Sequence, residues 1–273
     1  MEWSQLAHFV QQNCSSLDYD AVVCDETQDF TANHLRTLSS HLAEESSLTI
    51  VLDTAQRIYA RGYTWREIGF DLQANRSHTL RINYRNSTEI AKVAAAILDG
   101  VPRDDDFTIP SLERTVATGI KPVVLEGLYN KQVAFCIKYI KDNVNLDNET
   151  VAFLKPKGGN WFQHLEQELS INNLPYVTIT REAIWPDGDE EIALCTLHSS
   201  KGLEFDHVFI IGFNQECLSS WEDEEDHRYI TTRKLLGMGI GRAKKSLIIG
   251  YKPTQKSDLI DLINPDDYEL IQI

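Results

Sequence analysis

The stretch Ala21-Val22-Val23-Cys24-Asp25-Glu26-Thr27-Gln28-Asp29-Phe30 changes abruptly from apolar to acidic. Its first four residues are small or β-branched, which predicts a strand buried on both faces of a parallel sheet. Ligands of such sheets bind beyond the carboxyl ends of the strands, where Asp25 and Glu26 would lie. Adjacent carboxylates there can hold Mg²⁺ and orient a water molecule for attack on a phosphoryl group. The alternative for the same two residues is a turn or a helix cap.

The composition is that of a globular protein. The chain has 273 residues, 42% hydrophobic and 25% charged, enough for one large or two small domains. We find no apolar run of membrane-spanning length and no basic segment after Met1, so we expect a cytoplasmic protein without a membrane partner. The net charge of −15 argues against nonspecific polyanion binding, so any nucleic-acid site must be a local groove. The five scattered cysteines are expected to be buried free thiols.

Apolar runs alternate with amphipathic segments along the chain, which predicts an α/β fold with parallel sheets. We expect helices at residues 3–12, 32–44, 90–98, 131–142, 161–169 and 228–236. We expect strands at residues 21–24, 48–53, 80–85, 123–126, 151–154, 176–179, 207–213 and 246–251, and one beginning at residue 192. Thr31 is expected to cap the second helix, and Asn86 with Glu89 to form a capping box for the third. The polar segment 100–119 is expected to be a linker between domains.

Five segments carry most of the candidate chemistry: residues 25–29, 53–62, 80–85, 196–205 and 235–244. In this order they resemble motif II (the Walker B box) and motifs III, IV, V and VI of superfamily 1 DNA helicases of the UvrD/Rep type. The resemblance implies two RecA-like α/β domains with ATP bound between them. Residues 1–99 would be the C-terminal part of the first domain, with motifs II, III and IV. Residues 100–273 would be the second domain, with motifs V and VI.

The resemblance also implies roles for individual residues at a nucleotide site. Asp25 would hold Mg²⁺, Glu26 would act as general base or position the attacking water, and Gln56 would sense the γ-phosphate. Tyr84 would stack on adenine, and Arg85 and Arg242 would be paired arginine fingers that stabilise the transferring phosphoryl group. The turn in motif V would contribute three further residues that bind the nucleotide: Lys201, Gly202 and Glu204. Glu204 would lie near the ribose.

Single-stranded DNA is the other partner that the resemblance implies. Thr196, His198 and Arg61 would line the path of the strand, and Tyr63 or Trp65 would offer a ring on which a base can stack. The alternative for Tyr63 and Trp65 is a place in the protein core.

Two of the chain's departures from the family pattern bear directly on the nucleotide site. A phosphate loop has the pattern G-x-x-x-x-G-K-[ST], and this sequence contains no Gly-Lys dipeptide. We therefore expect an incomplete first RecA-like domain that needs an N-terminal helicase half or another protein partner. Motif VI is also rich in glycine, at Gly237, Gly239 and Gly241, which we expect to loosen the backbone that aims Arg242.

These observations leave three hypotheses. The first is a part of a UvrD-like DNA helicase or translocase, an ATP hydrolase that is weak or inactive by itself. The second is a noncatalytic module derived from a helicase that binds single-stranded DNA or a protein partner. The third is a metal-dependent nuclease that uses Asp25, Glu26 and Asp29, with Asp53 as the one further acidic strand end.

Overall fold

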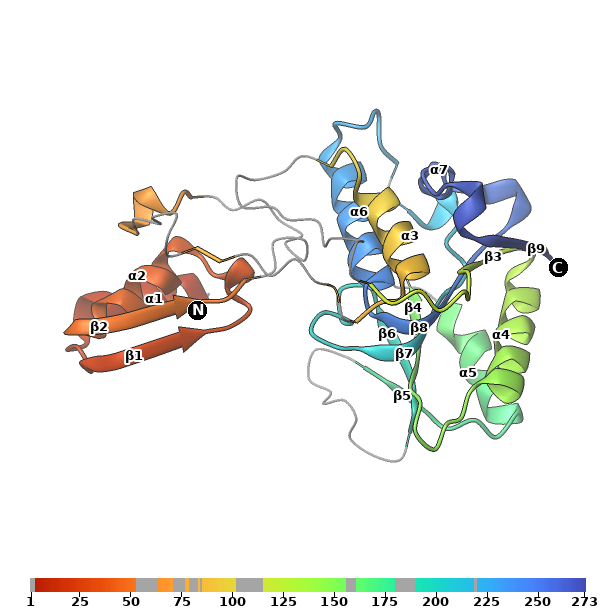
Figure 1. Ribbon diagram of the computed structural model, residues 1–273, viewed down its shortest axis with the longest axis horizontal. Helices are drawn as coiled ribbons and strands as arrows, with labels where there is room; N and C mark the ends of the chain where they lie inside the picture. Colours follow the sequence, from red (N-terminus) through yellow and green to blue (C-terminus); the bar gives the residue numbers. More distant parts are fainter. Residues whose placement is uncertain are drawn as a thin grey trace. The chain divides into compact units, whose positions relative to one another are not determined.

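The computed structural model describes residues 3–52, 63–70, 77–78, 83, 85–101, 115–155, 161–179, 190–218 and 220–273. The chain forms two compact units, residues 1–80 and residues 81–273 apart from 103–108 (Figure 1). The expected domain boundary near residue 100 differs from this division. Residues 85–101 belong to the second unit, because the helix they form packs on a helix from the C-terminal half of the chain.

The described part of the first unit contains two α-helices and a two-stranded sheet. Its elements are α1 (Trp3–Asn13), β1 (Tyr19–Cys24), α2 (Ala32–Ser40) and β2 (Leu42–Ile50). β1 and β2 pair in parallel, and α1 packs on α2. The predicted helix cap is confirmed, because the hydroxyl of Thr31 accepts a hydrogen bond from the His34 N–H at 3.4 Å.

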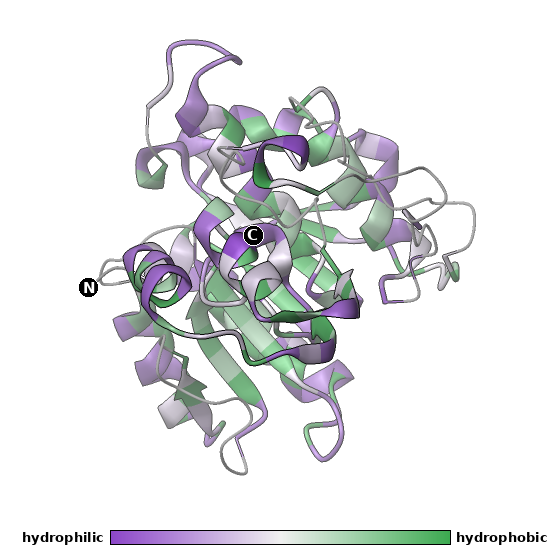
Figure 2. Cartoon of the chain, turned by 90° about the vertical axis from the view of Figure 1, so that its left-hand side faces the viewer, coloured by the Kyte–Doolittle hydropathy of each residue, from purple (hydrophilic) through white to green (hydrophobic). Residues whose placement is uncertain are grey.

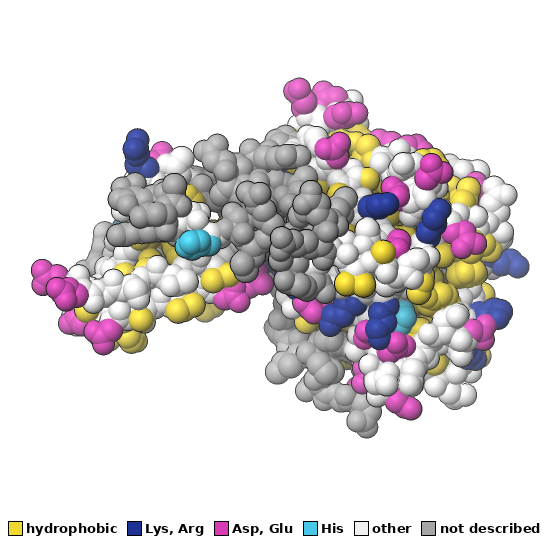
Figure 3. Space-filling model, in the orientation of Figure 1, with side chains coloured by type: hydrophobic (Ala, Val, Ile, Leu, Met, Phe, Trp, Pro, Cys, Tyr) yellow, Lys and Arg dark blue, Asp and Glu magenta, His cyan; other side chains and the backbone are white. Residues whose placement is uncertain are grey.

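Two expectations about this unit are wrong. Cys24 is the one buried residue of β1, whereas Val23 is 71% exposed and Tyr19 is 49% exposed. The described part of this sheet has two strands, so each strand has a neighbour on one side only. In addition, α2 ends at Ser40 rather than near residue 44, because the next strand begins at Leu42 instead of residue 48. The unit therefore exposes apolar as well as acidic side chains (Figure 3).

The second unit is built on a parallel sheet. Its strands are β3 (Val123–Glu126), β4 (Val151–Lys155), β5 (Tyr176–Thr178), β6 (Ile192–Thr196), β7 (Phe205–Ile210), β8 (Ala243–Tyr251) and β9 (Glu269–Gln272). Its α-helices are α3 (Thr88–Leu98), α4 (Tyr129–Asn143), α5 (Trp161–Ile171), α6 (His227–Ile240) and the short α7 (Asp258–Asp261). Among the described residues, seven strands form one sheet in the order β5-β6-β4-β7-β8-β3-β9, and every pairing is parallel.

This sheet is covered on both faces, as the predicted α/β fold requires. Alternate strand residues such as Phe153, Leu194 and Phe209 form a buried cluster with apolar side chains of α4 and α5. α3 and α6 pack side by side on the opposite face (Figure 1). The inner strands of the sheet are strongly hydrophobic (Figure 2), whereas a helix such as α4 carries one apolar and one polar side. A strand buried on both faces has this uniform hydrophobicity.

Membrane-spanning helices are absent from the part of the chain that the structure describes: no helix there combines sufficient length with sufficient hydrophobicity.

Candidate functional site

The acidic turn of the first unit follows β1 directly, as the sequence predicts. The carboxylate of Asp25 accepts a hydrogen bond from the Glu26 N–H at 2.8 Å, and both side chains are exposed. Glu26 has φ 54° and ψ 32°, in the left-handed region that residues other than glycine rarely adopt. Strain of this kind persists only where surrounding contacts enforce it, and it is concentrated at functional sites.

Two buried neighbours fix this turn. Thr27 donates its N–H and its hydroxyl to the carbonyl of Val51, at 3.1 and 2.8 Å. Gln28, which is 7% exposed, donates its side-chain amide to the carboxylate of Glu26. The amide therefore orients the carboxylate, a role that sequence reasoning missed although Gln28 stands within the segment quoted first.

Several predicted site residues lie outside the described residues: Gln56, Arg61 and Tyr84. Within the described ranges, His, Cys, Asp and Glu side chains form no group of three or more that could hold a metal ion.

Tyr63 and Trp65 are partly buried and contact each other. Their rings meet edge to face with centroids 6.3 Å apart, and the Tyr63 hydroxyl donates to the carbonyl of Phe30 at 2.9 Å. Trp65 also packs against Phe70, at a centroid distance of 6.2 Å. These contacts agree with the alternative that the two rings support the unit, while their partial exposure leaves each with an accessible surface.

In the second unit, residues from motifs IV, V and VI form an ion cluster, which consists of Arg85, Glu204 and Lys244. The carboxylate of Glu204 pairs with the guanidinium of Arg85 and with the ammonium of Lys244, the latter at 3.1 Å. Partial burial raises the pKa of Glu204, but hydrogen bonds and positive charge from Lys244 and Arg85 outweigh this effect and hold that pKa below its ordinary value. The side chains are 37% exposed for Arg85 and Glu204 and 41% for Lys244, so the cluster is accessible from solvent.

Arg242 is buried beside this cluster. It is 2% exposed, and its Nη1 donates to the carbonyl of Leu203 at 3.2 Å. The backbone links the two places, since Leu203 immediately precedes Glu204 and the Phe205 N–H donates to the carbonyl of Arg242 at 3.0 Å. In the second unit, Arg85 is thus the exposed arginine of the expected pair and Arg242 the enclosed one.

The expectation that glycines loosen the backbone before Arg242 is wrong. α6 continues through Gly237 and Gly239 to Ile240, and both glycines are buried. A Cβ atom at Gly237 would lie 2.8 Å from Leu98, and one at Gly239 would lie 2.3 Å from Leu197. The glycines therefore permit close packing, which restricts the helix.

The motif V turn follows β6 and is held by its own side chains. The Thr196 hydroxyl accepts a hydrogen bond from the Ser199 N–H at 3.0 Å and bonds the Ser199 hydroxyl at 2.9 Å. Gly202 has φ +80°, a conformation that glycine adopts without strain. His198 and Gly202 are exposed and Lys201 is partly buried, so the turn presents predicted DNA-facing and nucleotide-facing residues at the surface.

Lys155 is a candidate that sequence reasoning missed. It ends β4 and pairs in register with Thr196 of β6, so the two residues lie side by side at the carboxyl edge of the sheet. Its ammonium lies 4.0 Å from the centroid of the Phe162 ring. Burial lowers the pKa of Lys155, and Glu166 partly offsets this. A lysine directly after a predicted buried strand was the available signal.

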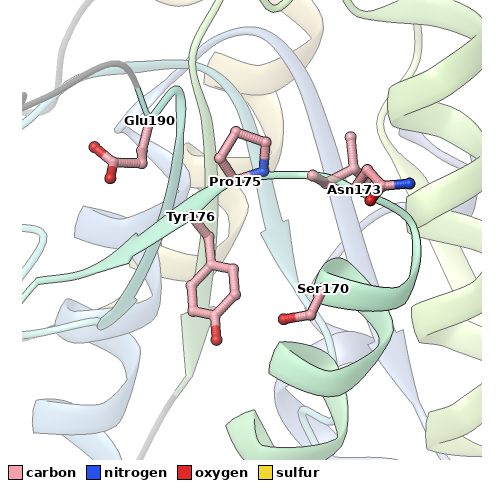
Figure 4. A pocket seen from close by; sticks show the side chains of 6 residues that line it. Ser170, Asn173, Pro175, Tyr176 and Glu190 are labelled. Atoms are coloured by element: carbon pink, nitrogen blue, oxygen red, sulfur yellow. The ribbon is translucent and has the colours of Figure 1, made fainter.

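A cavity of about 420 Å³ lies where α5 leads into β5 (Figure 4). Its described lining is Ser170, Asn173, Leu174, Pro175, Tyr176 and Glu190. These residues include none of the predicted site residues, so the cavity is separate from the ion cluster and from the motif V turn.

Comparisons with known proteins find similarity to DNA helicases. Residues 180–254 match the family model of the UvrD-like helicase C-terminal domain. A "Probable DNA helicase" of Mycoplasma pneumoniae is 25% identical over 243 residues, which is 84% of this chain and 42% of that protein. The "ATP-dependent DNA helicase Rep" of Buchnera aphidicola subsp. Acyrthosiphon pisum is 27% identical over 202 residues, 70% of this chain and 31% of that protein.

The chain thus spans less than half the length of these two curated relatives. A solved structure, the C-terminal domain of a possible DNA helicase from Lactobacillus plantarum WCFS1, has a TM-score of 0.49 and 20% identity over 69% of this chain and 98% of that one. By its family match and its helicase relatives, the chain contains a helicase C-terminal region of the UvrD/Rep type.

Proposed function

We propose that the chain is part of an ATP-dependent DNA helicase or translocase that acts on single-stranded DNA. It would need a phosphate loop from an N-terminal helicase half, supplied by a partner protein or by a longer parent chain. The observation that carries the proposal is the ion cluster of Arg85, Glu204 and Lys244, because three motif segments far apart in the sequence meet there.

The residues present suit Mg²⁺–ATP. Arg85 and Lys244 are accessible cations whose present partner is a carboxylate, an anion that a phosphate can replace. ATP supplies a transferable phosphoryl group whose developing charge needs such cations. Asp25 would hold Mg²⁺, and Glu26, oriented by the amide of Gln28, would position the attacking water. Gln56 would sense the γ-phosphate and Tyr84 would stack on adenine, as the resemblance implies; both residues lie outside the described residues.

Single-stranded DNA would bind at the carboxyl edge of the sheet in the second unit. Thr196 and His198 reach the surface there, and Lys155 adds a cation beside them. A local cation is what a chain with a net charge of −15 needs in order to contact phosphates. Arg61, Tyr63 and Trp65 would contribute from the first unit.

The test supplies the phosphate loop in trans. The purified chain is mixed with the N-terminal half of a Rep-type helicase, and DNA-stimulated ATP hydrolysis is measured. We expect turnover from the mixture and from neither half alone. Arg85→Ala should lower kcat on the order of 10²-fold, the usual effect of removing one group that stabilises transition-state charge. Arg228→Ala is the matched control, since Arg228 pairs with Asp226 on the surface of α6.

Two results would contradict this function. One is detectable, Glu26-dependent turnover by the purified chain alone, because we expect hydrolysis only when an N-terminal half is present. The other is a mixture that neither hydrolyses ATP nor binds single-stranded DNA.

A noncatalytic binding module is the second candidate, and the burial of Arg242 favours it. An arginine that is 2% exposed and bonded to the Leu203 backbone is held as a structural side chain would be. This candidate predicts DNA binding that is independent of ATP and unchanged by Arg85→Ala. Fluorescence anisotropy at several salt concentrations measures this binding. The logarithm of the binding constant should fall with the logarithm of the salt concentration, with a slope of about 0.7 for each phosphate contacted on a single strand.

A further inference from the structure

The side-chain amide of Asn86 bridges the segment that carries Arg85 and the segment that carries Arg242. Its Nδ2 donates to the carbonyl of Gly241 at 3.0 Å and to the carbonyl of Ala243 at 2.5 Å. These two carbonyls belong to the residues immediately before and after Arg242. One amide therefore fixes the backbone on both sides of that arginine.

A second amide completes the link on the Arg85 side. The Oδ1 of Asn86 accepts a hydrogen bond from the Nδ2 of Asn83 at 2.9 Å. The Oδ1 of Asn83 accepts from the Arg85 N–H at 3.0 Å and from the Asn86 N–H at 3.2 Å. We call Asn83 and Asn86 the amide clamp. It ties the backbone of Arg85 to the backbone around Arg242.

Asn86 is available for this role because it does not cap α3. The predicted capping box of Asn86 and Glu89 is wrong: Ser87 is the N-cap, and its hydroxyl accepts from the Ile90 N–H at 3.3 Å. Glu89 instead accepts a hydrogen bond from the Gly119 N–H at 2.8 Å.

The end of α6 needs a donor at this point. The last carbonyls of a helix have no intrahelical partner, and Gly241 is the C-cap of α6. An asparagine amide has two N–H donors, enough for one hydrogen bond to each carbonyl. Aspartate has the same shape but would place a carboxylate against both carbonyls, and alanine would leave them without this partner.

We propose that Asn86 is a positioning residue that holds Arg85 and Arg242 in one fixed relation for phosphoryl transfer. The proposal rests on the proposed function, because it assigns the two arginines to the same nucleotide. A ring of contacts closes the arrangement: Arg85 pairs with Glu204, and Leu203 accepts from Arg242. Displacement of the backbone at residue 241 or 243 would therefore move both guanidinium groups.

The first measurement is amide hydrogen exchange of the purified chain, which needs no nucleotide. In Asn86→Asp, we expect the amides of Gly241 and Arg242 to exchange about tenfold faster, since the hydrogen bonds that fix this backbone are lost and its local opening becomes easier. Exchange rates are compared after correction for each variant's free energy of unfolding. Asn86→Ala serves as the second variant if the aspartate prevents folding.

Arg233→Met is the matched control. Arg233 is 6% exposed and donates from Nε to the carbonyl of Ile97 at 2.8 Å, and from Nη2 to the carbonyl of Asp99. It thus joins α6 to the opposite end of α3. Its loss should destabilise the unit and speed exchange near residues 97–101, but leave the corrected rates at Gly241 and Arg242 unchanged.

The second measurement is ATP hydrolysis by the mixture with an N-terminal helicase half. Asn86→Asp should lower kcat about tenfold with KM within about twofold, because lost positioning acts on the transition state rather than on substrate binding. Faster exchange together with this fall in kcat supports the proposal.

Three outcomes overturn it. Unchanged exchange at Gly241 and Arg242 means that Asn86 does not hold this backbone. Faster exchange with unchanged kcat, while Arg85→Ala still lowers kcat, makes Asn86 only a helix cap and leaves the proposed function intact. Unchanged hydrolysis in Arg85→Ala itself removes both the proposed role of that arginine and the reason to position it.

Discussion

Gly237 of α6 lies directly against Leu98 of α3. A Cβ atom at position 237 would stand 2.8 Å from Cγ of Leu98, closer than side chains pack. Leu98 is 5% exposed and ends the helix that begins just after Arg85 and Asn86. The two helices can approach this closely only because Gly237 has no Cβ atom. This contact therefore fixes the point at which α3 crosses α6.

Gly237→Ala should destabilise the second unit despite the better helix propensity of alanine. Overpacking of a buried contact costs about 1–3 kcal/mol, whereas alanine gains about 1 kcal/mol over glycine within a helix. Urea denaturation of the two proteins measures the difference.

Leu98→Ala provides the matched background for this prediction. With the leucine truncated, the added methyl group at position 237 has room, so Gly237→Ala should cost nothing or become stabilising in the double variant. An equal loss in both backgrounds would show that Leu98 is not the obstacle.

Glu204→Ala should change the free energy of unfolding by no more than about 1 kcal/mol, because its ion pairs with Arg85 and Lys244 are more than one third exposed and solvent screens them. Lys138→Ala, which breaks the exposed pair with Asp142 on α4, is the reference for a surface pair. A loss of several kcal/mol at Glu204 would show that the ion cluster holds the fold rather than serving a ligand.

His207 should make stability fall on acidification. Burial lowers the pKa of His207, and Glu149 and Asp206 oppose this effect only in part while Lys245 reinforces it. Its Nδ1 also hydrogen-bonds the Ser246 hydroxyl at 2.8 Å. Because the folded-state pKa lies below the unfolded value, the unfolded chain takes up the proton first as the pH falls. The contribution of neutral His207 to the free energy of unfolding is therefore complete above about pH 6.5 and declines below that pH.

Chemical denaturation between pH 5 and 7.5 tests this slope, with His207→Gln as the variant. The decline over that range should be shallower in the variant. Two neighbouring carboxylates should contribute little to this slope. Hydrogen bonds and nearby positive charge hold the pKa values of Glu149 and Asp206 below their ordinary range, so both stay ionised between pH 5 and 7.5. An identical slope in both proteins would assign the pH dependence to other groups.

The cysteines should differ sharply in reactivity. Cys136 is fully buried, and burial raises the pKa of the Cys195 thiol to about 12, so neither supplies a thiolate near neutral pH. Cys14 is exposed. A thiol reagent such as DTNB should label Cys14 in the native protein and label Cys136 and Cys195 only after denaturation. Rapid native labelling of Cys195 would contradict the burial of β6.

Local pattern predicted most of the second unit, because its strands and helices carry strong periodicity. The predicted strands at residues 123–126 and 151–154 and the helix at residues 131–142 are confirmed as β3, β4 and α4 within two residues. Where three glycines weakened the helical pattern, the predicted helix ended too early, at residue 236 instead of Ile240. Leu98 and Leu197 stabilise that last turn, and neither is visible from the local sequence.

The resemblance predicts which residues belong to a nucleotide site but not how they are arranged. It assigns Arg85, Glu204 and Arg242 to one nucleotide, and that assignment stays a prediction. The pairing of Arg85 with Glu204 and the burial of Arg242 depend on contacts between distant segments. The prediction that β1 is buried on both faces was wrong for a similar reason. An apolar run indicates that a strand would be stabilised by burial, but it does not indicate whether the folded unit contains elements that pack on both of its faces.

The position of β3 has a consequence for folding kinetics. β3 lies between β8 and β9, and both neighbours come from the last part of the described chain. During synthesis, β3 and the helix that follows it emerge long before either pairing partner exists. Such nonlocal parallel pairings make folding slow and leave strand edges exposed in the meantime. Both edges of β3 are thus expected to stay unpaired in the nascent chain until residues 243–251 and 269–272 have been made.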